Sequence, residues 1–388
     1  MTGQVPGRLP YWRLSAYYFC YFASLGALVP YWGLFLQARG FDALAIGQLM
    51  ATLAGTKILA PMIWGHLADL SGRRMPLVRL ATLAAVAVFG LVFVANSFWA
   101  MAAAMTAFSF FWNASLPQME AVTFNHLGHR VVRYAQIRLW GSIGFILVVA
   151  GLGVQLEHAP LSVVPVWVAV LFAALWASAL AIPDSASLHG DGAGPSLRGL
   201  LARPEVQAFL AACFLMQLSH GTYYAFYSIY LKSAGYSSTA VGALWSWGVI
   251  AEVLVFLVMH RLLVGFGARR VLLWSLALAA LRWLLIGAFI EIAWVQVIAQ
   301  GLHAATFGTF HASAIHLVHH YFPGRTQGRG QALYNSLSFG AGGAAGSLMG
   351  GVLWEGPGGP LAAFALGAAA ALIGLAAVAR WVDRERRY

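Results

Sequence analysis

Long runs of apolar residues, separated by short polar turns, make up most of this 388-residue sequence. A membrane-spanning helix needs about 20 mostly apolar residues, and twelve runs reach that length. We expect the spans at 12–37, 44–64, 77–95, 98–122, 136–156, 162–182, 206–231, 239–263, 271–290, 294–318, 331–354 and 361–382. The pattern predicts an all-α membrane protein with 12 transmembrane helices.

The composition agrees with this prediction. Hydrophobic residues make up 61% of the chain and charged residues only 9%, whereas soluble domains carry about 25% charged residues. Two cysteines, Cys20 and Cys213, lie inside apolar runs, so packed thiols are expected rather than a disulfide. The net charge of +11 is spread over the helix ends and forms no extended basic face. It therefore indicates no nucleic-acid partner.

The distribution of the cations predicts the orientation in the membrane. If both termini are cytoplasmic, 19 of the 23 Lys and Arg residues lie at the inner surface, and the outer loops hold only Arg39 and Lys232. Cytoplasmic loops collect Lys and Arg. We therefore expect a bacterial-type inner-membrane protein with both termini in the cytoplasm. The outer loops would carry four carboxylates, Asp42, Glu157, Glu291 and Glu355.

The chain reads as two related halves joined by a linker. Residues 183–204 are rich in Gly, Pro and Asp, which is typical of a linker. A shift of 195 residues aligns Ala45-Ile46-Gly47 with Ala240-Val241-Gly242 and Arg74 with Arg269. We expect one six-helix bundle at 1–182 and a second at 205–388, related by an axis along the membrane normal.

Ionisable residues inside the expected spans are candidates for function, because charge at that depth is costly unless it faces a cavity or a partner. Glu120 lies late in the fourth span, in a polar stripe that includes Asn113, and Arg138 begins the fifth. The turn between these spans brings Glu120 and Arg138 to similar depth. They form either a structural ion pair or a binding site for a polar or anionic substrate.

A second set of ionisable residues lies in the other half. Glu252 is near the middle of the eighth span, Arg282 is in the ninth, and Lys57 is at the position equivalent to Glu252 in the repeat. A carboxylate that exchanges between an apolar and a cationic environment can carry a proton. Glu252 and Arg282 are either a fixed pair or part of proton coupling. We favour coupling, because buried pairs often add little stability.

Histidine and tyrosine supply further candidates. His303 and His311 are eight residues apart and share one face of the tenth span. Core packing, proton transfer and substrate hydrogen bonding all remain open for them, and no acid or Cys at ligand spacing supports a metal site. The hydroxyls of Tyr21 and Tyr224 lie in mid-span and need partners. We expect both to meet substrate.

The turn between the second and third spans contains Gly65, Asp69, Gly72, Arg73 and Arg74. This resembles the signature G-x-x-x-D-x-x-G-R-R/K of the major facilitator superfamily. The segments 138–145, 303–311 and 328–334 resemble one branch, the phenylpropionate-permease-like transporters, which are relatives of the lactose and nucleoside proton symporters. The resemblance implies the major facilitator fold and assigns the turn to the conformational change.

The resemblance also implies roles for the buried charges. In the lactose-type symporters, a Glu of helix 4 and an Arg of helix 5 bind the sugar. A Glu of helix 8, an Arg of helix 9 and a His and a Glu of helix 10 couple protons. Glu120, Arg138, Glu252 and Arg282 match by helix and depth, and His303 or His311 matches the histidine. The tenth span has no Glu, which places more weight on Glu252.

We therefore expect a proton-coupled symporter that imports a small organic solute by alternating access and binds it between Glu120, Arg138 and Arg282. An aromatic carboxylate such as 3-phenylpropionate is preferred, because two arginines among aromatic residues suit an anion that carries a ring. The first alternative is a sugar or nucleoside symporter. The second is a drug/proton antiporter, but such exporters often have a Gly-Pro motif in helix 5, and the fifth span here has no proline. A receptor or scaffold would not need polar residues at matched depths. No nucleophile–base pair or metal motif suggests an enzyme. We expect substrate, protons and lipid as partners, a monomer, and no cofactor beyond the proton gradient.

Overall fold

The structure is a computed structural model, and it describes residues 9–128, 130–184 and 197–382. The described residues form helices and no strand, so the predicted all-α class is confirmed. Most of the predicted linker, residues 185–196, lies outside the described residues. So do the terminal arginines Arg8, Arg384, Arg386 and Arg387.

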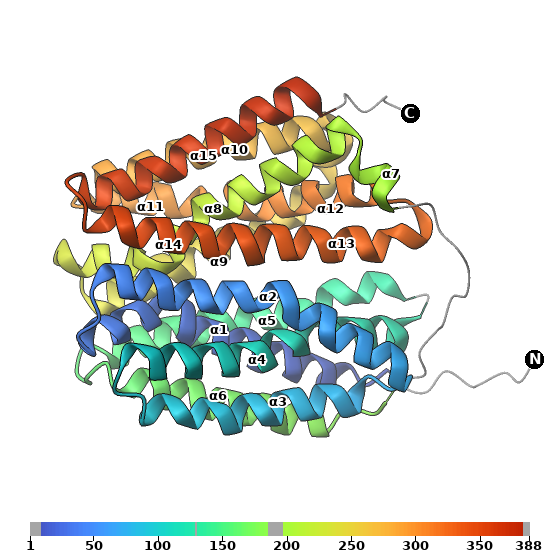
Figure 1. Cartoon of the computed structure of the whole chain (residues 1–388), viewed down its shortest axis with the longest axis horizontal. Helices are drawn as coiled ribbons and strands as arrows, with labels where there is room; N and C mark the ends of the chain where they lie inside the picture. The colour runs from blue at the N-terminus through green and yellow to red at the C-terminus, as the bar shows by residue number, and fades with distance from the viewer. Residues whose placement is uncertain (1–8, 129, 185–196, 383–388) are drawn as a thin grey trace, which may run out of the picture.

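The helices gather in two groups (Figure 1). The N-terminal group comprises α1 (Tyr11–Ala38), α2 (Ala43–Ser71), α3 (Met75–Phe89), η1 (Gly90–Phe93), α4 (Phe98–Leu127), η2 (Val131–Arg133), α5 (Tyr134–Gln155) and α6 (Val163–Leu180). A short helix, α7 (Leu197–Leu201), precedes the C-terminal group. The exact limits of the two bundles, 1–182 and 205–388, stay a prediction.

In the C-terminal group, two of the expected spans are each divided into shorter helices by a π-helical segment. The elements of this group are α8 (Pro204–Ser233), α9 (Ser238–Phe266), α10 (Ala268–Ala288), α11 (Ala293–Gly301), η3 (Ala304–Thr309), α12 (Phe310–Tyr321), η4 (Gly324–Thr326), α13 (Gln327–Asn335), η5 (Ser336–Gly342), α14 (Gly343–Trp354) and α15 (Gly359–Trp381). The segments η3 and η5 are π-helical. Such wide turns inside α-helices are frequent at functional sites.

Among the described residues, eight helices are long and apolar enough to cross a membrane. They are α1, α2, α3 with η1, η2 with α5, α6, α9, α10 and α15. The other predicted spans correspond to α4, α8, α11–α12 and α13–α14. Polar residues such as Gln118 in α4 and Gln217 in α8 lower their apolar character, and π-helical segments interrupt the last two. The total of twelve spans stays a prediction.

Polar side chains cap the starts of three helices. The side chains of Asp42, Ser97 and Ser237 accept hydrogen bonds from the third backbone N–H of α2, α4 and α9, respectively. These caps satisfy donors that a helix start leaves free. Gly72 ends α2 with φ +66°, a left-handed conformation that glycine adopts without strain.

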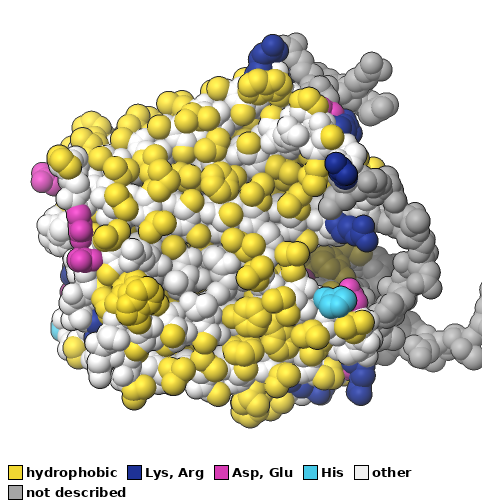
Figure 2. All heavy atoms as spheres, in the orientation of Figure 1, with side chains coloured by type: hydrophobic (Ala, Val, Ile, Leu, Met, Phe, Trp, Pro, Cys, Tyr) yellow, Lys and Arg dark blue, Asp and Glu magenta, His cyan; other side chains and the backbone are white. Residues whose placement is uncertain are grey.

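The two ends of the molecule differ in charge. The arginine end contains the turn Gly72–Arg74, together with the start of α1 and the end of α15 (Figure 1). The acidic end contains the loops with Asp42, Glu157, Glu291 and Glu355. A broad hydrophobic band separates acidic side chains on the left from most visible Lys and Arg on the right (Figure 2). This band fits a bilayer, and which end faces the cytoplasm stays a prediction.

Glycines allow close contact between helices. A carbon added at Gly346 in α14 would lie 2.0 Å from the backbone oxygen of Leu218 in α8. Between the groups, a carbon added at Gly47 in α2 would lie 3.0 Å from the Cα of Gly351 in α14. Small residues at such positions let backbones approach and pack in the membrane. The packing within the C-terminal group and between the two groups therefore depends on these glycines.

We expect Gly346→Ala to lower the free energy of unfolding by about 1–3 kcal/mol, because the methyl group would overlap backbone that cannot move aside. Gly151→Ala in α5 is the matched control, since nothing lies within 4 Å of its added carbon. Thermal unfolding in detergent compares them. Equal losses of stability in both variants would contradict this account of the packing.

Candidate substrate and proton site

The N-terminal group places an acid and an arginine near each other on α4 and α5. Tyr134 donates a hydrogen bond from its hydroxyl to Glu120 Oε1 over 3.1 Å. The Cζ of Arg138 lies 3.5 Å from the centre of the Phe22 ring. The charges of Glu120 and Arg138 interact, but the described residues contain no ion pair between them. The structural ion pair considered from the sequence is therefore not formed here.

Aromatic rings lie beside this pair. Tyr21 stacks on Trp112, with ring centres 5.1 Å apart and an angle of 18° between the planes. Asn113 donates to the backbone oxygen of Leu53 and to Thr56 Oγ1. Both of its amide protons therefore tie α4 to α2, which leaves only the amide oxygen for a ligand.

The C-terminal group pairs the acid of α9 with a histidine. The Oε2 atom of Glu252 lies 3.8 Å from His303 Nε2, and the Glu252 side chain is 19% exposed. The rings of His303, Phe307 and His311 stack in one column at 5.3 and 6.2 Å. Both histidines thus lie on one side of the segment, as their spacing predicts. His311 Nδ1 lies 3.0 Å from the Tyr334 hydroxyl.

Arg282 is fully enclosed in the C-terminal group. Its guanidinium donates to the backbone oxygen of Ala299, to Thr306 Oγ1 and to Gln300 Oε1. The ring of Tyr223 lies 4.4 Å away and covers it. The fixed Glu252–Arg282 pair considered from the sequence is absent among the described residues, because these oxygens, rather than a carboxylate, take the arginine donors.

Two other predicted residues are half-buried. Lys57 has no hydrogen bond or ion pair among the described residues. The ring of Tyr224 lies 6.4 Å from Trp245, with the planes at 24°. Both side chains are therefore partly accessible, on α2 and α8, respectively.

Arg138 interacts electrostatically with both groups. The charge of Arg138 in α5 acts on Glu120 within its own group and on Glu252 and His311 in the other group. Arg138 is half-buried, and no hydrogen bond or ion pair to it occurs in the described ranges. A cation in this setting can bind an added anion without first losing a carboxylate partner.

The signature turn is held by polar contacts inside the N-terminal group. Arg74 donates to Asp69 Oδ1 over 2.9 Å and to Gln118 Oε1 in α4 over 2.6 Å. The Asp69 side chain is 68% exposed. Gly65 lies in α2 and Gly72 at its end. The turn is thus fixed to α4, while its acid remains accessible at the arginine end.

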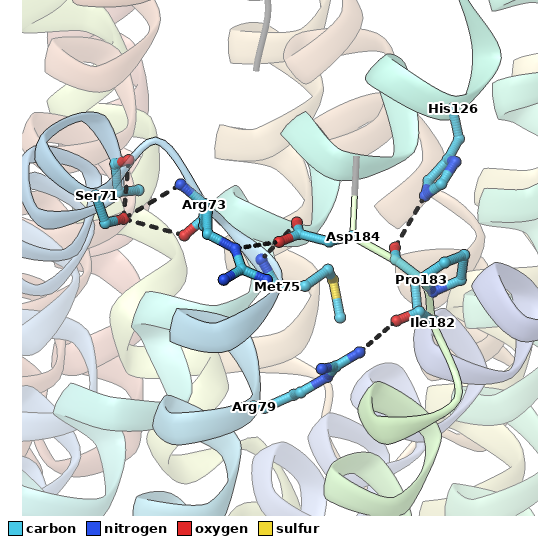
Figure 3. A network of polar contacts seen from close by, with 9 residues as sticks. Ser71, Arg73, Met75, Arg79, His126, Ile182, Pro183 and Asp184 are labelled. Atoms are coloured by element: carbon cyan, nitrogen blue, oxygen red, sulfur yellow. Dashed lines mark hydrogen bonds and ion pairs between the residues drawn. The ribbon is translucent and has the colours of Figure 1, made fainter. Parts of the chain in front are cut away.

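Figure 3 shows how Arg73 and Arg79 fasten this turn to the segment after α6. Arg73 Nε lies 3.3 Å from Asp184 Oδ2, and Arg79 donates to the backbone oxygen of Ile182 over 2.6 Å. His126 Nε2 lies 3.2 Å from the backbone oxygen of Pro183. These contacts join α3, α4 and α6 at the arginine end.

Comparison with known proteins decides the family. Residues 11–366 match the model of a family described as "MFS_1 like family". The chain belongs to the MFS_1-like family of the major facilitator superfamily. It is therefore a transporter with many membrane-spanning helices, and the prediction that it is not an enzyme is confirmed.

Curated relatives cover most of the chain. A "Probable 3-phenylpropionic acid transporter" of Escherichia coli is 31% identical over 88% of this chain and 90% of its own length. A "Maltose permease" of Geobacillus stearothermophilus is 28% identical over 87% and 86%. The crystal structure of a mutant of the nucleoside transporter NupG has a TM-score of 0.84 at 17% identity, over 96% and 100%. That likeness shows the fold alone.

The site contains several residues that the sequence did not predict. They are aromatic or amide side chains that hold the predicted ones: Phe22, Tyr134, Trp112, Tyr223 and Gln300. Tyr134 lies one helical turn before Arg138, and this spacing was the available signal. The others come from distant parts of the chain, where no local pattern marks them.

Cysteine accessibility tests this arrangement in a Cys20→Ser, Cys213→Ser background. We expect Arg138→Cys and Glu252→Cys to react with a water-soluble thiol reagent, because both side chains are partly exposed. Thr306→Cys should remain unlabelled, since Thr306 is fully buried against Arg282. Mass spectrometry measures the rate of labelling at each position. Faster reaction at position 306 than at 138 and 252 would contradict the assigned geometry.

Proposed function

We propose that this transporter is a proton-coupled symporter that imports a small aromatic carboxylate, such as 3-phenylpropionate, by alternating access. The observation that carries the proposal is Arg138. It is half-buried, lies on the Phe22 ring, has no ion-pair partner among the described residues and interacts electrostatically with Glu252 of the other group. The charge of Arg138 would therefore affect both the binding of a substrate anion and the protonation of Glu252.

The surroundings of Arg138 fit an anion that carries a ring. Arginine binds carboxylates through two parallel hydrogen bonds, and its guanidinium also stacks on aromatic faces. The half-buried Phe22 supplies apolar surface beside the guanidinium, and it packs against the buried ring of Tyr21. The name of the 31% identical relative, a probable 3-phenylpropionic acid transporter, supports the same substrate class.

Coupling to a proton follows from electrostatics. A carboxylate bound at Arg138 would offset the positive charge that acts on Glu252, and this favours binding of a proton to Glu252. By reciprocity, the proton on Glu252 favours binding of the anion. The complex that crosses the membrane then carries less net charge. His303 lies beside Glu252 and would orient or exchange this proton.

Arg282, Lys57 and Tyr224 have supporting roles in this proposal. Arg282 is enclosed, so it would contribute its charge to the C-terminal group instead of contacting substrate in this conformation. Tyr224 and Lys57 are partly exposed and would line the path that the substrate takes through the protein. The signature residues Asp69, Arg73 and Arg74 would govern the conformational change at the arginine end.

A sugar or nucleoside symporter is the second candidate. The relative named maltose permease, 28% identical, favours it. Glu120 and the Tyr134 hydroxyl would then bind the hydroxyl groups of a neutral substrate. A thermal-shift screen of aromatic acids, nucleosides and sugars distinguishes the two. Under either substrate we propose a monomer in a bacterial inner membrane, with both termini cytoplasmic.

Uptake by purified protein in vesicles should rise when the outside is acidified, because the inward proton gradient drives symport. Glu252→Gln should abolish uphill accumulation and retain exchange of labelled for unlabelled substrate, since the amide cannot release a proton. Radiolabelled 3-phenylpropionate measures both. Uptake that does not depend on the proton gradient would contradict proton symport. If Glu252→Gln also abolishes exchange, Glu252 is a structural or ligand-binding residue instead of a proton carrier.

Arg138→Gln should weaken binding of 3-phenylpropionate at least tenfold, since a hydrogen bond to a charged group contributes roughly 1.5–3 kcal/mol. The neutral amide of the same compound should lose less. Arg133→Gln changes an exposed arginine in the turn before α5, so it is the control and should bind as the wild type does. Calorimetry gives the affinities. Equal losses for acid and amide would exclude a carboxylate site at Arg138.

A further inference from the structure

Two carboxylates at the acidic end reach from one helix group to the other. Glu355, which follows α14, accepts hydrogen bonds from the backbone N–H groups of Ala43 and Leu44 over 2.8 and 3.4 Å. Both donors belong to the start of α2 in the N-terminal group. A loop of the C-terminal group thus holds the first turn of a helix in the other group.

The reciprocal contact is also present. Glu157, which follows α5, accepts a hydrogen bond from the backbone N–H of Thr239 over 2.6 Å, at the start of α9. This amide, together with nearby Ser237 and Lys232, holds the pKa of the Glu157 carboxyl below its ordinary value. A loop of the N-terminal group therefore binds a helix of the C-terminal group in the same way.

These carboxylates complete caps that the helices only begin. The first four N–H groups of a helix have no partner within it. Asp42 and Ser237 each satisfy the third N–H of their own helix, at Ala45 and Ala240. The earlier donors of α2 and α9 bind Glu355 and Glu157. A negative charge there also interacts favourably with the helix dipole.

The same spacing occurs twice around these contacts. A glycine lies four residues before each carboxylate, Gly153 before Glu157 and Gly351 before Glu355. A carbon added at Gly153 would lie 3.2 Å from the Cα of Gly242 in α9, and one added at Gly351 would lie 3.1 Å from that of Gly47 in α2. In each case the glycine packs against the same helix that the carboxylate caps, which is α9 for Gly153 and Glu157 and α2 for Gly351 and Glu355. This duplication argues against a chance surface contact.

The other end has no such bridges among the described residues. There, Arg73 and Arg74 bond Asp184 and Asp69 of their own group, and Arg269 donates to backbone oxygens near the end of α15. Within the described ranges, the hydrogen bonds between groups are those of Glu157 and Glu355, plus one from Ser336 Oγ to the backbone oxygen of Ile58.

We propose that Glu157 and Glu355 are gate residues that hold the acidic end closed by capping α9 and α2 across the two groups. Opening of this end would separate the groups and return the first N–H groups of both helices to water. The two contacts therefore set the balance between the closed and open states. The inference rests on transport by alternating access, and it does not depend on the proposed substrate or proton.

Distance measurements between spin labels test the gate without any substrate. Ser162→Cys and Ser233→Cys place exposed labels at the acidic end on opposite groups, in the Cys20→Ser, Cys213→Ser background. Glu157→Ala with Glu355→Ala should raise the ratio of long to short distances by about ninefold to a hundredfold, since losing each cap changes an equilibrium by roughly threefold to tenfold. Each single substitution should give a smaller change.

Glu291→Ala is the matched control. Glu291 is an exposed carboxylate at the same end and has no hydrogen bond to the other group among the described residues. Unchanged distances in the double variant, or an equal change in the Glu291 control, would overturn the proposal.

A disulfide gives an independent test if the double variant fails to fold. In the same background, Glu157→Cys with Thr239→Cys should form a cross-link, and the labels are then attached to positions 162 and 233 through thioether bonds, which reductants do not cleave. The cross-linked protein should show the short distance and no substrate exchange, and reduction of the cross-link should restore the exchange and the long distance. A cross-linked protein that still exchanges substrate, or that still shows the long distance, would also overturn it.

Discussion

Burying a charge inside a membrane is the constraint on which the rest of this structure depends. An arginine or acid at the centre of a spanning helix costs about 2.5–3.5 kcal/mol by insertion measurements. Arg282 meets this constraint with three oxygen acceptors and two aromatic faces. Arg138 lies near the start of α5, is partly exposed and contacts the Phe22 ring. This difference separates a structural cation from one that is available to a ligand.

The packing of the helices determines where those charges can meet. Glycine pairs, such as Gly47 with Gly351 and Gly153 with Gly242, bring the two groups into backbone contact near the acidic end. In these contacts α2 packs on α14 and α5 packs on α9, so each group lays two of its helices against the other. The arrangement suits rigid movement of one group against the other, as in transporters built from repeats.

The sequence predicted the positions of the helices well, but it did not predict which side chains the buried charged residues contact. Apolar length located most elements to within a few residues, because a helix that spans a bilayer needs about 20 mostly apolar residues. The π-helical turns in η3 and η5 were not foreseen, since one extra residue leaves no mark on an apolar run. The partner of Glu252 is His303 rather than Arg282, and that choice depends on tertiary packing, which no local spacing encodes.

The central claim is that substrate binding and proton binding are linked through Arg138 and Glu252. The most direct measurement is proton uptake by the purified protein when 3-phenylpropionate is added in weakly buffered solution near neutral pH. The account predicts uptake of up to about one proton per bound anion, and its loss in Glu252→Gln while the anion still binds. Anion binding with no proton uptake at any pH, or uptake unaffected by Glu252→Gln, would contradict it.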